Sequence, residues 1–404
     1  MPFAQTGALW RGRLTVLAGL VILGLNLRAA VTTVAPVLTR IREEVALSPT
    51  AESLIATAPP LMFAVFGALA PLWGRLWGLE RVIAGAMALA AGATAARAAT
   101  GSELVFLIAT GLIMAGLGTA NVAVPPLIKR YFPDRVGLMT TASTVFLVVG
   151  QALPPAFAVP VADRLGWRWA VGLWAVGSAL AALPWVVQPY RQSRRRRRAG
   201  QARPARKGGR GARVVRSKTF WGITGLLVCN TVAAYALMGW LPQIMIDAGA
   251  PPRQGALWLT WFTAGSLAGA LVVPVLTVRL RRPWILVVIM FAGWTIGLAG
   301  LMLWPLRGTW LWIALTRLGD GNYACAVTLM NLRTRSPKTL LAVSGFGQAV
   351  GYSVAALATF AFGQIHAATG SWSWPLTLLI CTMPLGLLGG LVACRRGFVE
   401  DQAG

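Results

Sequence analysis

Twelve long apolar stretches run through this 404-residue chain. They lie at residues 14–38, 51–72, 82–100, 104–126, 136–160, 168–188, 219–245, 255–278, 283–304, 309–331, 340–366 and 372–394. A helix of about 20 apolar residues crosses the hydrocarbon core of a bilayer. The charged fraction is only 12%, about half that of a soluble domain. We therefore predict an all-α integral membrane protein with twelve transmembrane helices.

The basic residues lie mainly on one side of the predicted membrane. With the N-terminus placed inside, 28 of the 37 Lys and Arg residues fall on the side of both termini and seven on the other. The remaining two, Arg28 and Arg317, fall within predicted helices. Because Lys and Arg accumulate in cytoplasmic loops, we expect a multi-pass protein of the cell (inner, cytoplasmic) membrane with both termini in the cytoplasm.

A basic segment separates two halves of the chain. Residues 189–218 include five consecutive arginines, Arg194 to Arg198, and no acid. We expect a cytoplasmic linker attracted to anionic lipid headgroups. Basic residues on the cytoplasmic side account for the net charge of +26, so we expect no nucleic-acid partner. The predicted domains are an N-terminal six-helix bundle at 1–188, the basic linker at 189–218 and a C-terminal six-helix bundle at 219–404.

A faint internal repeat supports this division. The segment from Leu117 to Asn121 recurs from Leu318, and the segment from Gly67 to Pro71 recurs from Gly269, at offsets of 201 and 202 residues. Matching segments at nearly one offset, in corresponding helices, favour an internal duplication. We predict two pseudo-symmetric six-helix bundles, the architecture of major facilitator transporters.

Several segments resemble one branch of that superfamily. They are residues 24–32, 126–133, 135–139 and 166–169, with a looser match at 345–351. In these segments the chain resembles the cyanate and 2-nitroimidazole transporters of the major facilitator superfamily. The resemblance implies a secondary active transporter, or permease, for a small anionic or polar molecule. It also implies alternating access between two bundles around a central site lined by the first, fourth, seventh and tenth helices.

Other functions remain open at this stage. A proton-coupled drug efflux pump is the alternative among transporters, although Gly150 to Pro155 matches the exporter signature poorly. A non-transporting membrane sensor or scaffold would need a domain beyond the linker. We find no catalytic cluster, phosphate-binding loop or metal-ligand spacing, so we expect no enzyme activity, no cofactor and no metal. The expected partners are a small-molecule substrate, protons as candidate coupling ions and the lipid bilayer, with the protein as a monomer.

Arg28 is the main candidate for substrate binding. It lies 14 residues into the first span, or roughly 21 Å along a helix, and charges at this depth usually mark function. A guanidinium offers a planar donor fork to an anion or a carbonyl. The competing interpretation is a structural partner for a helix end or for Asp320. Thr32 shares a helix face with Arg28, whereas Asn26 points away and is expected to hydrogen-bond a neighbouring helix.

Four further polar residues are candidates for substrate binding. Asn121, Tyr235 and Tyr323 lie on the fourth, seventh and tenth predicted helices, and Gln348 lies on the eleventh. Gln348 belongs to a polar stripe with Ser344 and Tyr352, at a spacing of four residues. Such a stripe equally fits cavity lining and hydrogen bonding between helices.

Arg317 and Asp320 are candidates for coupling or for an intramembrane ion pair. They are three residues apart on nearly one helix face, and Asp320 is the one acid placed well inside a predicted span. Asp320 as a proton carrier and Arg317–Asp320 as a permanent ion pair both remain open. The single histidine, His366, is expected at a wet loop edge rather than in a proton relay.

The predicted orientation can be tested with reporter fusions. A reporter active only in the periplasm should be silent when fused after Gly404 and active when inserted within 250–253. The reverse pattern would show that the assignment of the two membrane sides is wrong.

Overall fold

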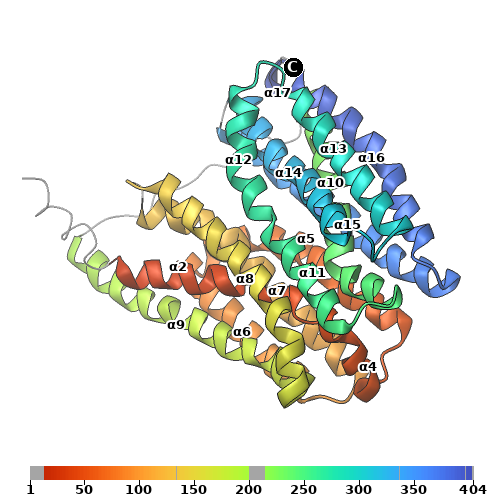
Figure 1. Cartoon of the computed structure of the whole chain (residues 1–404). Coiled ribbons are helices and arrows are strands. Elements are labelled where there is room, and N and C mark those ends of the chain that lie inside the picture. The colour runs from red at the N-terminus through yellow and green to blue at the C-terminus, as the bar shows by residue number, and fades with distance from the viewer. Residues whose placement is uncertain (1–12, 133, 200–213, 336, 396, 403–404) are drawn as a thin grey trace, which may run out of the picture. The chain divides into compact units, whose positions relative to one another are not determined.

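The computed structural model describes residues 13–132, 134–199, 214–335, 337–395 and 397–402. Within these residues the regular structure is entirely helical (Figure 1). The chain divides into two compact units, unit 1 with residues 1–46 and 65–205 and unit 2 with residues 47–64 and 206–404.

Unit 1 contains the predicted first and third to sixth spans. Its helices are α2 (Leu14–Asn26), α3 (Ala29–Thr32), η1 (Ala35–Val37), α4 (Leu38–Val45), α6 (Leu79–Ala99), α7 (Glu103–Tyr131), α8 (Val136–Leu165) and α9 (Trp167–Ala199). Helix α5 (Pro49–Leu76) is divided between the units, its first part belonging to unit 2. In unit 1, α6 packs extensively against α7 and α9, and α2 packs against α8 and α9.

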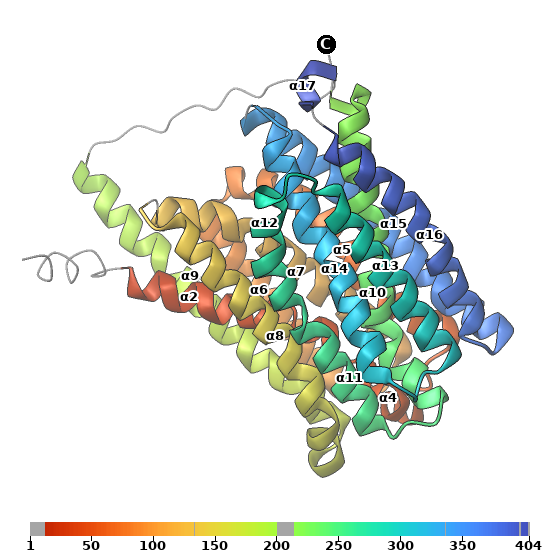
Figure 2. The same ribbon diagram turned by 45° about the horizontal axis from the view of Figure 1, so that its top comes forward.

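Unit 2 contains the remaining helices. They are η2 (Val214–Arg216), α10 (Lys218–Asp247), α11 (Pro252–Ala264), α12 (Ser266–Arg279), α13 (Trp284–Leu303), α14 (Thr309–Leu332), α15 (Pro337–Thr369), α16 (Ser373–Cys394) and α17 (Val399–Gln402). Ser217 caps α10, because its hydroxyl accepts a hydrogen bond from the Phe220 amide at 3.2 Å. Figure 2 shows α10, α13, α14 and α16 running side by side, in agreement with their contacts.

The predicted membrane spans coincide with long helices. Eleven segments of the described chain are long and apolar enough to cross a membrane. The twelfth predicted span, 309–331, is α14, which is 24 residues long but is made more polar by Arg317, Asp320 and Asn322. The predicted all-α membrane fold is confirmed, and α14 carries an ion pair, Arg317 with Asp320, within a predicted span.

Two predicted spans are broken rather than continuous. In the first, α2 ends at Asn26, and Arg28 stands before α3 with φ −121° and ψ −9°. In the eighth, α11 ends at Ala264 and α12 starts at Ser266, with Gly265 between them. Helix breaks leave backbone groups outside the regular hydrogen-bond ladder, and within a membrane they are tolerated where protein or a water-filled cavity surrounds them.

The predicted linker begins as a helix. Helix α9 continues beyond residue 188 to Ala199, which is consistent with the high helix propensity of arginine. Residues 200–213 lie outside the described part of the chain. The boundaries of two six-helix bundles at 1–188 and 219–404 therefore stay a prediction.

Ion pairs link helix ends at one end of unit 1. Arg40 of α4 pairs with Asp163 of α8. Arg168 of α9 pairs with Glu44 at 3.1 Å and donates to the carbonyl oxygens of Ala98 and Thr100 at 3.0 and 2.8 Å. Arg168 thus fastens the start of α9 to both α4 and the end of α6.

Gly150 provides a test of helix packing in unit 1. A Cβ atom at this position of α8 would overlap the backbone of Leu25 in α2, whereas a Cβ atom at Gly111 of α7 would meet nothing within 4 Å. We expect Gly150→Ala to destabilise the protein by about 1–3 kcal/mol, because a well-packed contact is overfilled. Gly111→Ala should leave stability unchanged or slightly raised. Thermal unfolding in detergent measures both variants, and equal stability of the two would contradict this packing.

Candidate functional site

The break in the first span positions Arg28. Its carbonyl oxygen accepts hydrogen bonds from the amides of Val31 and Thr32 at 3.1 and 3.4 Å, which starts α3 immediately after the break. The Arg28 side chain is half-buried. The backbone of Arg28 is therefore fixed by its own helix, and its side chain projects from an irregular point in the middle of a predicted span.

The two polar neighbours of Arg28 have packing roles. Thr32 is fully buried, and its hydroxyl donates to the carbonyl oxygen of Gln151 in α8 at 2.9 Å. Asn26 is 5% exposed. It lies against Gly177 of α9, because a Cβ atom added to Gly177 would collide with the Asn26 amide oxygen. The Asn26 amide donates to the Ile22 carbonyl oxygen of its own helix at 3.0 Å, so the described residues show Asn26 packed against α9 without the expected hydrogen bond to a neighbouring helix. Thr32 joins α3 to α8 and presents no free surface.

In unit 2 the structure brings two of the polar candidates near one aromatic residue. Tyr235 of α10 is buried, and its ring lies edge-on to that of Tyr352 in α15 at a centroid distance of 5.9 Å. Tyr352 also packs edge-on against Phe63. Gln348, one turn earlier in α15, donates to the Ser344 hydroxyl at 2.8 Å. The predicted stripe of three polar residues is therefore linked partly within its own helix.

The remaining two candidates are less enclosed. Tyr323 of α14 is 37% exposed. Asn121 of α7 is half-buried. Each lies within its own unit, on the helix where it was predicted, and a role in substrate binding stays a prediction for both.

Arg317 and Asp320 form an ion pair on α14. The side chains are only 7% and 17% exposed, respectively. The Arg317 guanidinium also lies over the ring of Phe262 in α11, 4.2 Å from its centroid, at the distance of a cation–π contact. Gly265, at the break between α11 and α12, makes room for it, because a Cβ atom there would come within 2.9 Å of the Arg317 Cγ.

Two further residues complete this polar network. Asn230 of α10 donates from Nδ2 to Asp320 Oδ1 at 3.2 Å, while Arg317 binds Oδ2. Trp294 of α13 donates from its indole to Asn230 Oδ1 at 3.1 Å. The indole thereby fixes the orientation of the amide, whose NH2 group must then face the carboxylate. Both oxygens of the Asp320 carboxylate therefore accept a donor, one from Asn230 and one from Arg317.

Asn230 and Trp294 were not identified from sequence as functional candidates. Asn230 lies near the middle of the apolar 219–245 stretch, and an amide at that depth is a usable signal because a polar group in a membrane span requires a partner. Trp294 had no comparable signal, since tryptophan serves equally as an apolar packing residue.

A second buried acid lies at the opposite end of unit 1 from the Arg168 contacts. Glu80, at the start of α6, is 5% exposed. It pairs with Arg130 at 2.8 Å and accepts a hydrogen bond from the Tyr131 hydroxyl at 2.8 Å. Burial, followed by the hydrogen bond to Glu80, raises the pKa of Tyr131 well above its ordinary value. Tyr131 therefore acts as a neutral donor that joins the end of α7 to the start of α6.

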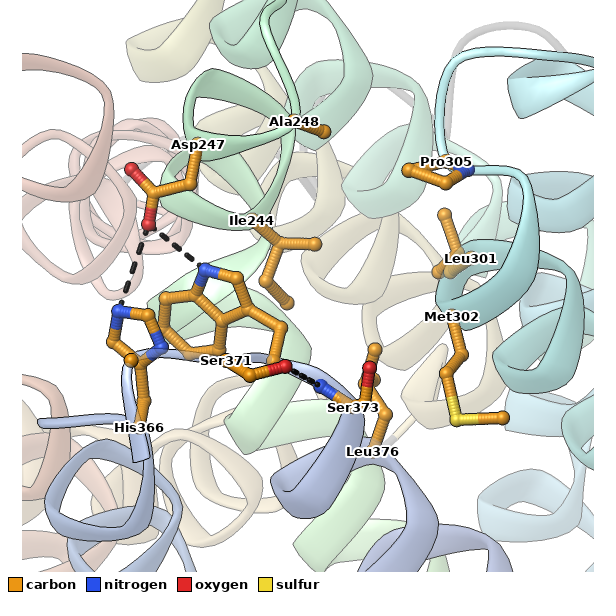
Figure 3. A pocket seen from close by; sticks show the side chains of 12 residues that line it. Ile244, Asp247, Ala248, Leu301, Met302, Pro305, His366, Ser371, Ser373 and Leu376 are labelled. Carbon is orange, nitrogen blue, oxygen red and sulfur yellow. Dashed lines mark hydrogen bonds and ion pairs between the residues drawn. The ribbon is translucent and has the colours of Figure 1, made fainter. Parts of the chain in front are cut away.

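Unit 2 has a cavity of about 460 Å³ at the ends of α10, α13 and α15 and the start of α16 (Figure 3). Asp247 Oδ2 accepts a hydrogen bond from the Trp372 indole at 2.8 Å and lies 3.6 Å from His366 Nε2. The His366 ring stacks on Trp372 at 3.6 Å, and Asp247 Oδ1 accepts a bond from Gln243 at 2.6 Å. His366 lines the cavity as expected of a wet position, but it is held against an aromatic ring.

Comparison with known proteins gives the family. The sequence matches the Major Facilitator Superfamily over residues 20–359. It is 30% identical to the 2-nitroimidazole transporter of Escherichia coli (strain K12), over 95% of this chain and 96% of that protein. It is also 30% identical to the uncharacterized transporter YycB of Bacillus subtilis (strain 168), over 95% of this chain and 94% of that protein. It is 26% identical to the cyanate transport protein CynX of E. coli (strain K12), over 87% of this chain and 90% of that protein.

Solved structures agree on the fold. A crystal structure of a D-xylose–proton symporter superimposes with a TM-score of 0.74, covering 96% of this chain and 99% of the other at 12% sequence identity. The resemblance predicted from the short segments near Arg28 and after the fourth span is confirmed by the family match and by the relatives at 26–30% identity. This chain belongs to the major facilitator superfamily and is a multi-pass membrane protein of the secondary active transporter class, not an enzyme.

Proposed function

We propose that this protein moves a small anionic or polar molecule across the cytoplasmic membrane by alternating access, and that Arg28 binds the substrate. The observation that carries the proposal is the half-buried guanidinium at the break between α2 and α3. A break in a membrane helix is a common place for a substrate site. The names of two relatives, a 2-nitroimidazole transporter and a cyanate transport protein, support a small polar or anionic substrate.

We further infer that Arg317 and Asp320 are a permanent ion pair rather than a proton-carrying site. The carboxylate accepts donors at both oxygens, from Arg317 and Asn230, and taking up a proton would weaken both contacts. The network joins α10, α13 and α14, and the Arg317 ring contact adds α11. On this view the pair holds the helices of unit 2 together throughout transport.

We propose that both termini and the basic segment lie in the cytoplasm. The predicted distribution of Lys and Arg supports cytoplasmic termini and a cytoplasmic basic segment at 189–218 that faces anionic headgroups. We propose that the protein works as a monomer. Protons remain the candidate coupling ion, with their site elsewhere than Asp320.

The substrate role of Arg28 can be tested by transport. A thermal-shift screen of purified protein with cyanate, nitrate, small carboxylates and 2-nitroimidazole identifies a ligand, and uptake of that ligand into proteoliposomes measures function. Arg28→Ala should lower uptake at subsaturating substrate by at least about 30-fold, the loss for one partner of a buried charge contact. Arg28→Lys should rescue poorly, because the planar donor fork is lost.

Arg253→Ala is the matched control, because it removes an exposed arginine of α11. This variant should transport normally. Normal uptake by Arg28→Ala would refute the substrate role. If Arg28→Ala fails to accumulate in the membrane while Arg28→Lys accumulates and transports normally, Arg28 is a structural partner instead.

The ion-pair inference predicts a stability pattern. Asp320→Ala leaves the Arg317 guanidinium buried without its counter-charge and should destabilise the protein by about 3 kcal/mol or more. The double change Arg317→Ala with Asp320→Ala removes both charges and should unfold at a higher temperature than either single variant. Thermal unfolding in detergent measures all three.

The transport assay distinguishes the two roles of Asp320. In Asp320→Asn, a permanent pair predicts that pH-gradient-driven accumulation and substrate exchange are both kept or both lost. Loss of gradient-driven accumulation with exchange retained would instead assign the proton-carrying role to Asp320 and overturn the inference.

A further inference from the structure

Arg97 is a fully buried arginine that the transport proposal does not use. It lies in the last turn of α6, and its side chain is 0% exposed. Its Cζ atom lies 5.8 Å from the centroid of the Phe106 ring in α7, which is itself fully buried. An arginine near a helix end ordinarily extends its charge to water, and Arg97 does not.

The guanidinium of Arg97 is fully buried, and the described part of the chain offers it no acceptor. Among the described residues none of its three nitrogens has a hydrogen-bond partner. Nearby arginines at the same end of unit 1 are paired, Arg40 with Asp163 and Arg168 with Glu44. A buried charge with neither a counter-charge nor hydrogen bonds is strongly unfavourable, so the site is incomplete without a further group.

Trp167 supplies a second buried donor beside the same ring, that of Phe106. It begins α9, is 2% exposed, and its indole nitrogen also has no partner in the described structure. Its ring lies 6.2 Å from that of Phe106. Arg168 holds Trp167 near the end of α6. The Arg168 guanidinium lies over the Trp167 ring, 4.7 Å from its centroid, and donates to the carbonyl oxygen of Ala98, the residue after Arg97.

The chemistry of this cluster defines the missing group. Guanidinium and indole nitrogens are donors only, so the group must supply several acceptor lone pairs. A water molecule can accept hydrogen bonds, but it is also a donor and it carries no charge that would neutralise the guanidinium. An oxyanion supplies several lone pairs and neutralises the guanidinium, in the charge-assisted geometry that arginine forms with carboxylate and phosphate.

We propose that Arg97 and Trp167, at the end of unit 1 where α6, α7 and α9 meet, form a binding site for a compact oxyanion, either a phosphate or a carboxylate. The source is a lipid headgroup or a small free anion. Under the predicted topology the last turn of α6 lies at the outer membrane surface, where lipid phosphates are abundant. Because both donors are buried, the bound group should exchange slowly and survive purification.

Native mass spectrometry of protein purified without phosphate or carboxylate buffers tests the proposal. The wild type should carry one phospholipid or one small oxyanion. Arg97→Gln should lose it, whereas Arg164→Gln, which removes an exposed arginine at the end of α8, should keep it. Absence of any adduct from the wild type, together with no thermal response to added anions, would overturn the proposal.

Thermal unfolding of delipidated protein separates the two sources. A rise in Tm with sodium phosphate or acetate over matched sodium chloride identifies a free anion, and a rise only with phosphatidylglycerol identifies a lipid headgroup. Trp167→Phe keeps the ring but removes the donor, and should weaken the apparent affinity about 10-fold. An equal response in wild type and Arg97→Gln would count against the site.

Arg97→Met provides an independent check. If Arg97 had no counter-anion, replacing it by an apolar side chain of similar length would remove an uncompensated buried charge and raise stability. With an anion bound, the wild type should unfold at a higher temperature than Arg97→Met when the anion or lipid is present. A more stable Arg97→Met under every condition would refute the site.

Discussion

The free energy of burying charge in an apolar environment is the constraint on which this structure depends. A membrane span tolerates an ionised side chain only where another group replaces the lost water. In α14 that replacement is nearly complete, since the carboxylate of Asp320 contacts Arg317 and Asn230 and the guanidinium contacts a ring. The Arg97 guanidinium, by contrast, has no hydrogen-bond partner among the described residues. The requirement that a buried charge has a partner therefore explains the Arg317–Asp320 pair as structural, and it identifies the surroundings of Arg97 as a site that lacks a group.

Breaks in helices accompany the charged residues in both units. Arg28 itself stands between α2 and α3. In unit 2, Arg317 packs beside Gly265, where α11 gives way to α12. A regular helix satisfies its own backbone and leaves little room for a large polar side chain. A break supplies that room, and glycine at the second one removes the Cβ atom that would collide with Arg317. Arg28 differs in being half-buried, which is why it, rather than Arg317, is the candidate for binding substrate.

Much of the fold could be predicted because membrane spans depend on local composition. The spans near 82–100 and 283–304 match α6 and α13 closely, since about 20 apolar residues are needed wherever a helix crosses a bilayer. The i,i+3 pairing of Arg317 with Asp320 followed equally from helix geometry. Thr32 shows the limit of this reasoning. Its place on the face of Arg28 could be predicted, but its hydrogen bond to Gln151 depends on how α3 and α8 pack, which periodicity does not contain.

The sequence by itself determined the class of protein, the number of predicted spans, the family and the position of the charged residues along the helices, because hydropathy and short motifs are properties of consecutive residues. Only the tertiary structure decided which of these charges have partners. Asn230 reaches Asp320 from a helix 90 residues away in sequence, and Trp294 reaches Asn230 from a helix 64 residues away. The buried Arg97 lies beside Phe106, which belongs to α7 rather than to its own helix. Partners in a helical bundle come from different helices, so their identity depends on packing and not on any local pattern.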